Sequence, residues 1–327
     1  MRRAERGMAK AIAPPLLLLF VLAGYAGHQV PLASPDQSPE SLHISVDVAL
    51  VVLHATVTDR QGGFASNLVE QDFEVYEDSV RQRIRLFQHE DTPVTVGLVV
   101  DHSGSMGPKI AEVIVAARSF VQSSNPEDQM FVVNFNENVK LGLPEAIRFT
   151  ANSAELERAI GKPPANGQTA LYDAIAKALE QLQLGSRDKK VLIVVSDGGD
   201  NASMRSDLAQ VVNMAERSSA IIYTIGVFDK EDPDQNPRVL KRLAAATGGE
   251  AFLPERLSEV VAICERIARD IRHQYTFGYV PSNLARDGAY RAIRVVARAK
   301  GHGKLSVRTR TGYRVGGEPR ADEKGAQ

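Results

Sequence analysis

Cysteine is almost absent from this chain, which has one cysteine, Cys264, among its 327 residues. A single cysteine cannot form an internal disulfide, and the sequence contains no cluster of Cys and His residues of the kind that binds zinc. Cys264 lies in a segment with helical periodicity, so we expect a buried thiol that packs like a small apolar side chain. The fold must therefore be stabilised by its hydrophobic core, for which 43% hydrophobic residues are sufficient.

The chain also has no large excess of positive or negative charge. The sequence has 39 Lys and Arg residues against 40 Asp and Glu residues, a formal net charge of −1, without any long run of like charges. A protein that binds nucleic acid usually carries a basic surface, so we expect no nucleic-acid partner. The Gly-x-x-x-x-Gly-Lys-Ser/Thr loop that holds nucleotide phosphates is absent, so no nucleotide is expected either.

The apolar segment near the N-terminus is short for a membrane span. Basic residues precede an apolar run from Ala11 to Ala26, and small residues end it. This order is typical of a secretory signal peptide, and the run falls short of the roughly 20 residues that a spanning helix needs. We therefore predict a signal peptide at 1–26 and a secreted, periplasmic or cell-envelope protein. The alternative is an uncleaved anchor, the one case in which we expect contact with a membrane.

Two segments with the alternation of antiparallel strands stand far apart in the sequence. They are 42–92, with candidate strands at 44–58, 73–77 and 83–87, and 273–315, with candidate strands at 275–279, 290–299 and 305–310. Neither segment has enough strands for a stable sandwich of its own. We therefore predict that they pair into one antiparallel, β-sandwich-like domain, preceded by a linker at 27–41 and followed by a disordered tail at 316–327.

The segment between them, 93–272, has a different pattern. Val94 to Val100 is a nearly continuous apolar run, typical of a parallel strand buried on both faces. Helical and strand patterns then alternate, with helices at 109–122, 171–184, 207–217, 237–247 and 257–271 and further strands at 130–135, 191–195 and 221–227. This alternation predicts an α/β fold, a doubly wound and mostly parallel sheet inserted into the smaller β domain.

Three polar segments lie beyond the carboxyl ends of predicted strands, the edge where open α/β sheets bind ligands. Asp101, Ser103 and Ser105 form the first, and alternate residues of a loop can project to the same side. Thr169 belongs to the second, and Asp197 to the third. Two carboxylates and three hydroxyls form an all-oxygen set that favours a hard ion such as Mg²⁺ or Mn²⁺. The simpler interpretation is helix capping for Ser105 and Thr169 and a solvated turn for Asp101.

These same five residues, in the order Asp101-x-Ser103-x-Ser105, Thr169 and Asp197, resemble the metal-ion-dependent adhesion site of von Willebrand factor A domains. The resemblance covers about residues 93–272. The segments on either side, 58–60, 72–78, 274–279 and 312–313, resemble those of bacterial secreted proteins that are grouped as von Willebrand factor A-related. The fold that the resemblance implies is a Rossmann-like α/β domain, in agreement with the strand and helix pattern.

The resemblance also implies a function. It implies a metal-dependent protein-binding or cell-adhesion module, not an enzyme, which binds an Asp or Glu of its partner at an open position of the metal. Asp101, Ser103 and Ser105 would come from one loop, with both serines as direct ligands, while Thr169 and Asp197 would alternate between direct and water-mediated contact. We predict a partner-binding rim of His102, Met106, Gln168 and Gly198, with His102 facing solvent.

Two other functions compete with binding. A metal-dependent phosphohydrolase would also use an aspartate at a strand end, but it usually needs a second carboxylate close by and a lysine, where this chain has serines. Ser105 is not in a Gly-x-Ser-x-Gly motif, which disfavours a serine nucleophile. A structural module whose metal only stabilises the fold is the other alternative. Asp200 and Asn201 are expected to cap the following helix or hydrogen-bond the loop instead of binding metal.

Overall fold

The computed structural model describes residues 50–161, 163–228 and 233–316. The predicted signal peptide and linker, the start of the first β segment and nearly all of the predicted tail lie outside these ranges. Within the ranges, no helix combines the length and the apolar character that a membrane crossing requires.

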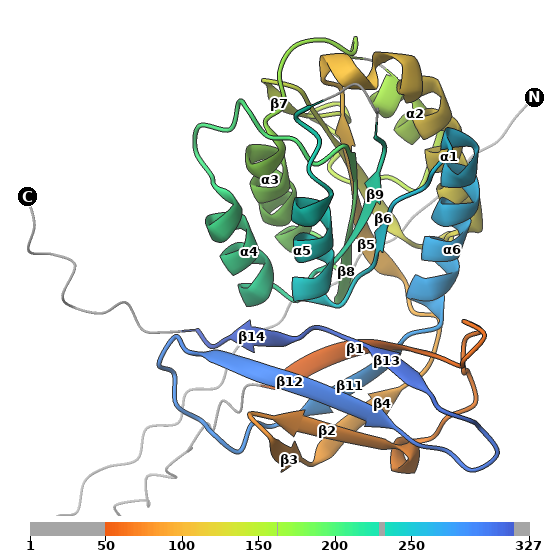
Figure 1. Cartoon of the computed structure of the whole chain (residues 1–327), viewed down its shortest axis with the longest axis vertical. Coiled ribbons are helices and arrows are strands. Elements are labelled where there is room, and N and C mark those ends of the chain that lie inside the picture. Colours follow the sequence, from red (N-terminus) through yellow and green to blue (C-terminus); the bar gives the residue numbers. More distant parts are fainter. Residues whose placement is uncertain (1–49, 162, 229–232, 317–327) are drawn as a thin grey trace, which may run out of the picture. The chain divides into compact units, whose positions relative to one another are not determined.

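The central sheet of the α/β domain has six strands in the order β10-β9-β8-β5-β6-β7 (Figure 1). The strands are β5 (Val94–Asp101), β6 (Gln129–Phe135), β7 (Val139–Leu141), β8 (Lys189–Ser196), β9 (Ile221–Gly226) and β10 (Ala251–Phe252). All neighbours are parallel except β6 and the edge strand β7. Every residue of β5 is buried, as expected for a central strand that is covered on both faces.

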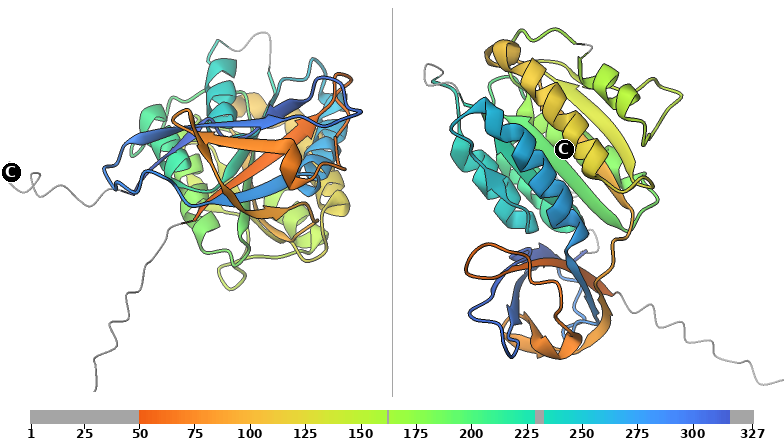
Figure 2. Two further views of the ribbon diagram at one scale, coloured as in Figure 1. Left: turned by 90° about the horizontal axis from the view of Figure 1, so that it is seen from below. Right: turned by 90° about the vertical axis from the view of Figure 1, so that its right-hand side faces the viewer.

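Helices cover both faces of this sheet, with α1, α2 and α6 on one face and α3, α4 and α5 on the other (Figures 1 and 2). They are α1 (Ile110–Ser123), α2 (Ser153–Gly161), α3 (Leu171–Gln183), α4 (Leu208–Arg217), α5 (Pro237–Thr247) and α6 (Val260–Arg272). Two 3₁₀ turns, η2 (Gly104–Lys109) and η3 (Leu257–Glu259), lead into α1 and α6. Cys264 on α6 is buried with a free thiol, as expected.

The β domain consists of two antiparallel sheets, in the orders β13-β1-β11-β4 and β14-β12-β2-β3. Its elements are β1 (Val51–Thr58), η1 (Glu70–Asp72), β2 (Phe73–Glu77), β3 (Val80–Gln82), β4 (Ile84–Gln88), β11 (Tyr275–Tyr279), β12 (Tyr290–Ala297), β13 (Ser306–Arg308) and β14 (Gly312–Arg314). Each sheet combines strands from both sequence segments, and the two sheets face each other (Figure 2). The predicted fold class, an α/β domain inserted into a smaller antiparallel domain, is confirmed.

A tight cluster of aromatic side chains forms the core of the β domain. Phe73 packs against Phe87, Tyr275 and Phe277, with ring centroids 4.8 to 5.7 Å apart. Two of these rings come from the segment before the α/β domain and two from the segment after it. The core therefore exists only when both segments fold together, which is why neither was expected to be stable alone.

A buried carboxylate joins the two domains. Asp270 at the end of α6 is 2% exposed. It accepts hydrogen bonds from the Thr56 hydroxyl on β1 at 2.5 Å and from the Tyr223 hydroxyl on β9 at 2.9 Å, and it pairs with Arg308 on β13. A buried charge is tolerated only with such partners, so these contacts must be kept in the folded protein. They hold α6 against β9 of the six-stranded sheet and against β1 and β13 of the β domain.

Candidate metal-binding site

The first loop of the candidate site begins where β5 ends. The Asp101 carboxylate is fully buried and accepts hydrogen bonds from the Ser103 backbone N–H at 2.8 Å and from the Ser196 hydroxyl at 2.6 Å. The 3₁₀ turn η2 starts at Gly104, so the chain turns sharply directly after Ser103. Asp101 is therefore held in one orientation by its own loop and by the neighbouring strand β8, of which Ser196 is the last residue.

The third loop follows β8 and brings the second carboxylate to the first loop. The Ser105 hydroxyl donates to Asp197 Oδ2 at 2.7 Å and lies 3.3 Å from the Ser103 hydroxyl. The other oxygen of Asp197 accepts from the Gly199 backbone N–H at 2.9 Å. Asp101, Ser103, Ser105 and Asp197 thus form one connected group at the carboxyl edge of the sheet, as the sequence predicts.

The second loop approaches both of the others through its backbone. The Gly104 N–H donates to the Gly167 carbonyl at 3.1 Å, which connects the first and second loops. Thr169 is 7% exposed, and its N–H donates to the Asn201 side chain at 2.8 Å, while its carbonyl accepts from the Asn201 and Ala202 N–H groups. These contacts bring Thr169 beside the third loop and leave its hydroxyl out of the hydrogen bonds found among the described residues.

The electrostatics of the group favour a cation. Burial, reinforced by the nearby charge of Asp197, raises the pKa of Asp101 to about 6, even though Ser196 and Ser103 hydrogen-bond to it. Across the described ranges, neither Asp101 nor Asp197 has a Lys, Arg or His ion-pair partner. A divalent cation would supply the missing positive charge, and the surrounding donors are all oxygen atoms, which Mg²⁺ and Mn²⁺ prefer.

Only two carboxylates contribute to this group. In the part of the chain that the structure describes, no cluster of three or more His, Cys, Asp or Glu side chains could hold a metal ion. A metal here would thus depend on hydroxyl oxygens from Ser103, Ser105 and Thr169 together with Asp101 and Asp197. The five residues fit a hard ion by chemical type, and their role as ligands stays a prediction.

The prediction that His102 faces solvent is wrong. His102 is 1% exposed, and its Nε2 lies 3.0 Å from the side-chain oxygen of Asn134 on β6. Successive residues of an extended chain point to opposite sides. Since Asp101 and Ser103 face the candidate site, His102 between them points into the domain.

Met106 and Gly198 do not form an exposed rim either. Met106 is 0% exposed because η2 turns it into the hydrophobic core beneath the loop. Gly198 is buried and adopts a positive φ of +80°, with space for a side chain blocked by the Asn236 carbonyl. Of the four predicted rim residues, Gln168 is the exposed one, with its N–H donating to Glu137 at 3.1 Å.

Asp200 and Asn201 hold loops together. Asp200 accepts from the Tyr172 N–H in the first turn of α3 at 3.1 Å and from the Ser203 hydroxyl at 2.6 Å. Asn201 binds the backbone of Thr169, as described above. Their side chains thus hydrogen-bond within the protein, in line with the loop role expected for them. The helix that Asp200 caps is the preceding α3, however, whereas Asp207 caps the following helix α4.

Two residues that position the group were missed in the sequence. Ser196 holds Asp101, and Asn134 holds His102 and also donates to the Ala159 carbonyl at 2.7 Å. A signal for Ser196 was present, because a hydroxyl residue at the end of a central strand lies beside the end of the neighbouring strand. The signal for Asn134 was weaker, since it consists only of a polar residue within the apolar strand 129–135.

The family model of the von Willebrand factor type A domain matches residues 95–263, more than half of the chain. The chain belongs to this family. The matched segment contains all of the six-stranded sheet except Val94, and all five candidate metal ligands of this von Willebrand factor A protein.

Known proteins resemble the chain over parts of their length. It is 26% identical over 171 residues to an uncharacterized protein of Synechocystis sp., which covers 52% of this chain and 39% of that protein. It is 27% identical over 224 residues to the human inter-alpha-trypsin inhibitor heavy chain H2, covering 65% of this chain and 22% of that one. The aligned region therefore spans well under half of either relative.

A solved structure, a von Willebrand factor type A protein from Catenulispora acidiphila, has 15% sequence identity with a TM-score of 0.49. The superposition covers 78% of this chain and 76% of that one.

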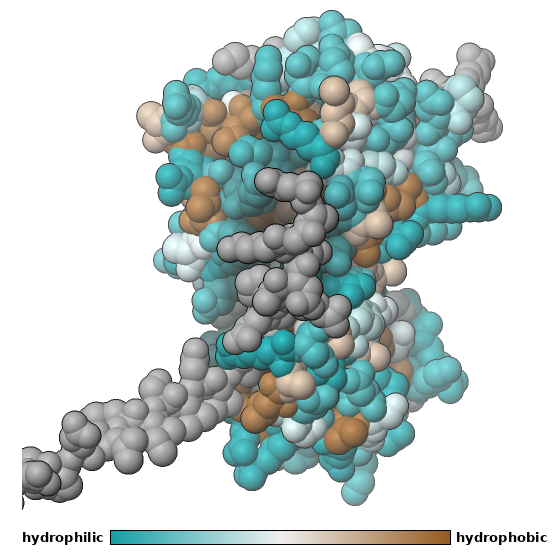
Figure 3. Space-filling view, turned by 90° about the vertical axis from the view of Figure 1, so that its left-hand side faces the viewer, coloured by the Kyte–Doolittle hydropathy of each residue, from teal (hydrophilic) through white to brown (hydrophobic). Residues whose placement is uncertain are grey.

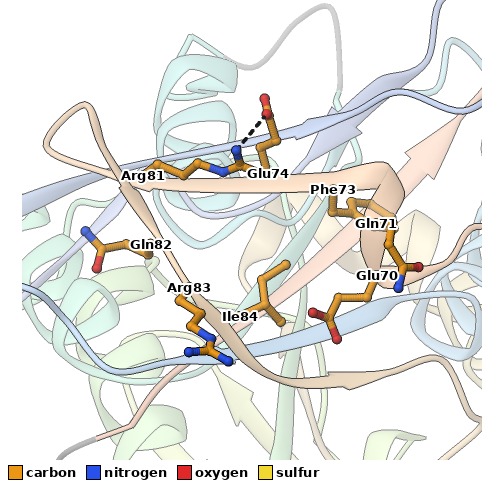
Figure 4. Close-up of a pocket in the computed structure, with 8 residues that line it drawn as sticks. All are labelled: Glu70, Gln71, Phe73, Glu74, Arg81, Gln82, Arg83 and Ile84. Atoms are coloured by element: carbon orange, nitrogen blue, oxygen red, sulfur yellow. Dashed lines mark ion pairs between the residues drawn. The ribbon is translucent and has the colours of Figure 1, made fainter.

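The β domain contains a cavity of about 490 Å³, lined by Glu70, Gln71, Phe73, Glu74, Arg81, Gln82, Arg83 and Ile84 (Figure 4). Its lining residues come from η1, β2, β3 and β4 and the residue between the last two strands. Glu74 is paired with Arg81 at 3.5 Å and with Arg298 at 3.3 Å. The cavity thus shares no residue with the group around Asp101, and Glu74, one of its two carboxylates, is paired with two arginines.

Proposed function

We propose that this von Willebrand factor A protein is an exported binding module that uses one divalent cation, Mg²⁺ or Mn²⁺, to capture an Asp or Glu of a protein partner. The observation that carries the proposal is the buried pair of carboxylates, Asp101 and Asp197, surrounded by hydroxyls and lacking a basic partner in the described residues. Such a pair is costly by itself and becomes favourable beside a cation.

In this proposal Asp101, Ser103, Ser105, Thr169 and Asp197 hold the cation, as in the adhesion sites that this family often carries. The bound cation would offer an open position to a partner's carboxylate in a site shielded from water, where the attraction between opposite charges is strong. Gln168, which is exposed on the second loop, belongs to the rim that the partner would contact.

Binding is favoured over catalysis by the surroundings of the hydroxyls. A serine nucleophile needs a base within hydrogen-bond reach. The histidine nearest in sequence, His102, points away and is held by Asn134. Ser105 donates to Asp197, but in this proposal the Asp197 carboxylate binds the cation and is not free to act as the base. Export is supported by the basic, apolar and small residues of the N-terminal 26, in the order of a signal peptide.

The test is calorimetric titration of Mg²⁺ and Mn²⁺ into metal-stripped protein, with Asp101→Ala and, as a matched control, Asp188→Ala. Asp188 is an exposed aspartate directly before β8, at the end of that strand opposite to Ser196 and Asp197. We expect one ion per chain for the wild type and Asp188→Ala, and no binding for Asp101→Ala. Equal binding by all three proteins would place the ion elsewhere and contradict the proposal.

A second measurement separates binding from a purely structural ion. An ion with a purely structural role would raise the melting temperature strongly, and partner binding would not depend on whether the ion is present. For a binding module we expect a chelator to abolish capture of a partner at a temperature at which the metal-free protein is still folded. Partner capture that persists in chelator would favour the structural role.

A further inference from the structure

The loop between β8 and α4 carries a very exposed apolar side chain. Met204 is 94% exposed, whereas the next most exposed large hydrophobic residue among those described, Leu284, is 71% exposed. Single exposed apolar residues are common on proteins and need no explanation by themselves. Met204 differs from such residues in two respects, the fixed backbone on which it stands and its position in the fold.

The backbone around Met204 is held by the first turn of α3. The N–H groups of Met204 and Arg205 both donate to the Asp173 carboxylate, at 3.0 and 3.2 Å. The Ser203 hydroxyl accepts from the Asp173 N–H at 3.1 Å and donates to Asp200. A mobile loop tip would lack such bonds, so Met204 is presented in a defined place instead of being left in solvent by disorder.

The same loop contacts a candidate metal ligand. The N–H groups of Asn201 and Ala202 donate to the Thr169 carbonyl at 2.9 and 3.0 Å, and α3 begins at Leu171, two residues after Thr169. The loop that displays Met204 is therefore packed on the segment that carries Thr169. Met204 follows Ala202, which touches Thr169, by only two positions.

The side of the molecule with α3 and α4 has no broad apolar surface in view. Figure 3 shows this side as mostly hydrophilic, with hydrophobic residues in separate areas. A partner that docks here must gain its apolar contact from a few side chains. A methionine suits that role because its flexible, polarizable side chain adapts to different shapes.

We propose that Met204 is a specificity contact, which selects partners that place an apolar side chain beside the acidic residue bound by the metal. The inference rests on the proposed function, since the metal must first hold the partner's carboxylate. To the proposed function this inference adds the kind of partner segment that is recognised, namely an Asp or Glu with a large aliphatic side chain within two residues of it.

The experiment uses the protein loaded with Mg²⁺ and labelled with ¹³C at its methionine methyl groups. Two synthetic peptides are titrated, acetyl-Gly-Gly-Glu-Gly-Gly-amide and acetyl-Leu-Gly-Glu-Gly-Leu-amide, and binding is followed by NMR. We expect the leucine peptide to bind about tenfold more tightly, since burial of one aliphatic side chain is worth about that factor. It should also shift the Met204 methyl signal, whereas the glycine peptide should shift it much less.

Met204→Gln keeps the length of the side chain and removes its apolar character, so the preference for leucine should fall to nearly none. Leu184→Gln is the matched control, because Leu184 is 55% exposed at the opposite end of α3, and this variant should keep the preference. Both variants should bind Mg²⁺ as the wild type does. Equal affinity of the wild type for the two peptides, or a full preference in Met204→Gln, would overturn the inference alone. If Mg²⁺ binds and neither peptide does, the proposed function itself fails and this inference fails with it.

Discussion

At the scale of single residues, Asp101 has a position that would stabilise a bound cation and that destabilises the protein without one. Its carboxylate is fully buried next to a second carboxylate, and burial raises its pKa from 3.8 to about 6. At neutral pH the metal-free protein must therefore keep a charge in an unfavourable place. Functional sites often carry such a cost, which substitution can remove together with the function.

We expect Asp101→Asn to make the metal-free protein more stable at pH 7. A pKa raised in the folded state favours folding below the unfolded value of 3.8, and this contribution is lost as the pH rises through about 6. The neutral asparagine does not lose this stability as the pH rises. For a pKa shift of this size, the difference in the free energy of unfolding is at most about 3 kcal/mol. The advantage of the asparagine should thus grow between pH 4 and pH 6 and be nearly absent at pH 4.

Urea denaturation in the presence of a chelator, at pH 4 and at pH 7, measures the effect. Asp188→Asn, which removes an exposed carboxylate, should change the free energy of unfolding little at either pH. Asp101→Asn could instead destabilise the protein equally at both pH values. In that case the hydrogen bonds that the Asp101 carboxylate accepts from Ser103 and Ser196 stabilise the protein more than its buried charge destabilises it.

The orientation of His102 shows what local sequence reasoning missed at this scale. Because alternate residues of an extended chain share one side, Ser103 lies beside Asp101 as predicted, and for the same reason His102 points to the other side, into the domain. Its partner there, Asn134, lies 32 residues further along the chain. The alternation was readable from the sequence, whereas the identity of the partner depends on how β5 and β6 pair.

At the scale of elements, the long and strongly patterned segments were predictable and the short ones were not. The spacing predicts β2 at 73–77, α5 at 237–247 and β11 at 275–279, with the bounds that the structure has. Among the described residues, the helix α2, with nine residues, and the strands β3, β7, β10 and β14, with two or three residues each, were not predicted. Segments this short are stabilised by tertiary packing more than by their own pattern.

The same limit applies to the break between β3 and β4. The alternation at Arg83 to Phe87 predicts β4 to within one residue, but it does not predict β3, which ends at Gln82 and belongs to the other sheet. Arg83 is the point at which the chain passes from one sheet to the other. Nothing in the alternation marks that passage, because both strands keep the same period.

The loop after β8 depends on a glycine, and we expect Gly198→Ala to disturb the candidate site. Gly198 has a φ of +80°, and a Cβ there would lie 2.4 Å from the Asn236 carbonyl oxygen. The positive φ alone costs an alanine about 1 to 2 kcal/mol. The clash must move the backbone next to Asp197, so Mg²⁺ affinity should fall as well.

Gly301→Ala is the matched control for this prediction. Gly301 has a φ of +82°, but no other atom lies within 4 Å of the place that a Cβ would occupy. It should therefore lose about 1 to 2 kcal/mol from the backbone term and keep full metal affinity. Denaturation and calorimetry on both variants decide the matter, and equal metal affinity in Gly198→Ala and the wild type would show that the loop tolerates the shift.

At the scale of the whole molecule, the α/β domain is an insertion into a β-hairpin. β4 and β11 are antiparallel neighbours with Gln88 opposite Thr276, and the rings of His89 and Tyr275 stack 4.1 Å apart at the open end. The chain leaves the β domain after this pair and returns to it at the same point. Beyond it, Asp91 and Arg272 form an ion pair at 2.7 Å. Domain insertions are tolerated best at such loop ends.

The β domain should consequently fold without its insertion. In a chain of residues 50–89 joined to 275–316 by an Asn-Gly turn, the two strands would form an ordinary two-residue hairpin. The core of the domain is unchanged by the excision, since it is formed by residues from β1, β2, β11 and β12 and the loop after β1. Arg308 would lose Asp270 as an ion-pair partner, but its guanidinium would then be hydrated, so the loss should lower the stability of the β domain little.

We expect this shortened chain to give a dispersed NMR spectrum and to unfold cooperatively, at a lower temperature than the whole protein because a small domain buries less of its surface. Phe277→Ala in the same chain tests whether the native core is responsible. Phe277 is fully buried against Phe73 and Phe87, and its loss should cost about 3 to 5 kcal/mol and abolish folding. A shortened chain that is unfolded even with Phe277 intact would mean that the network around Asp270 does more than join two independent domains. The β domain would then need the α/β domain in order to fold, and the site around Asp101 and the two sheets would have to be regarded as one cooperative unit.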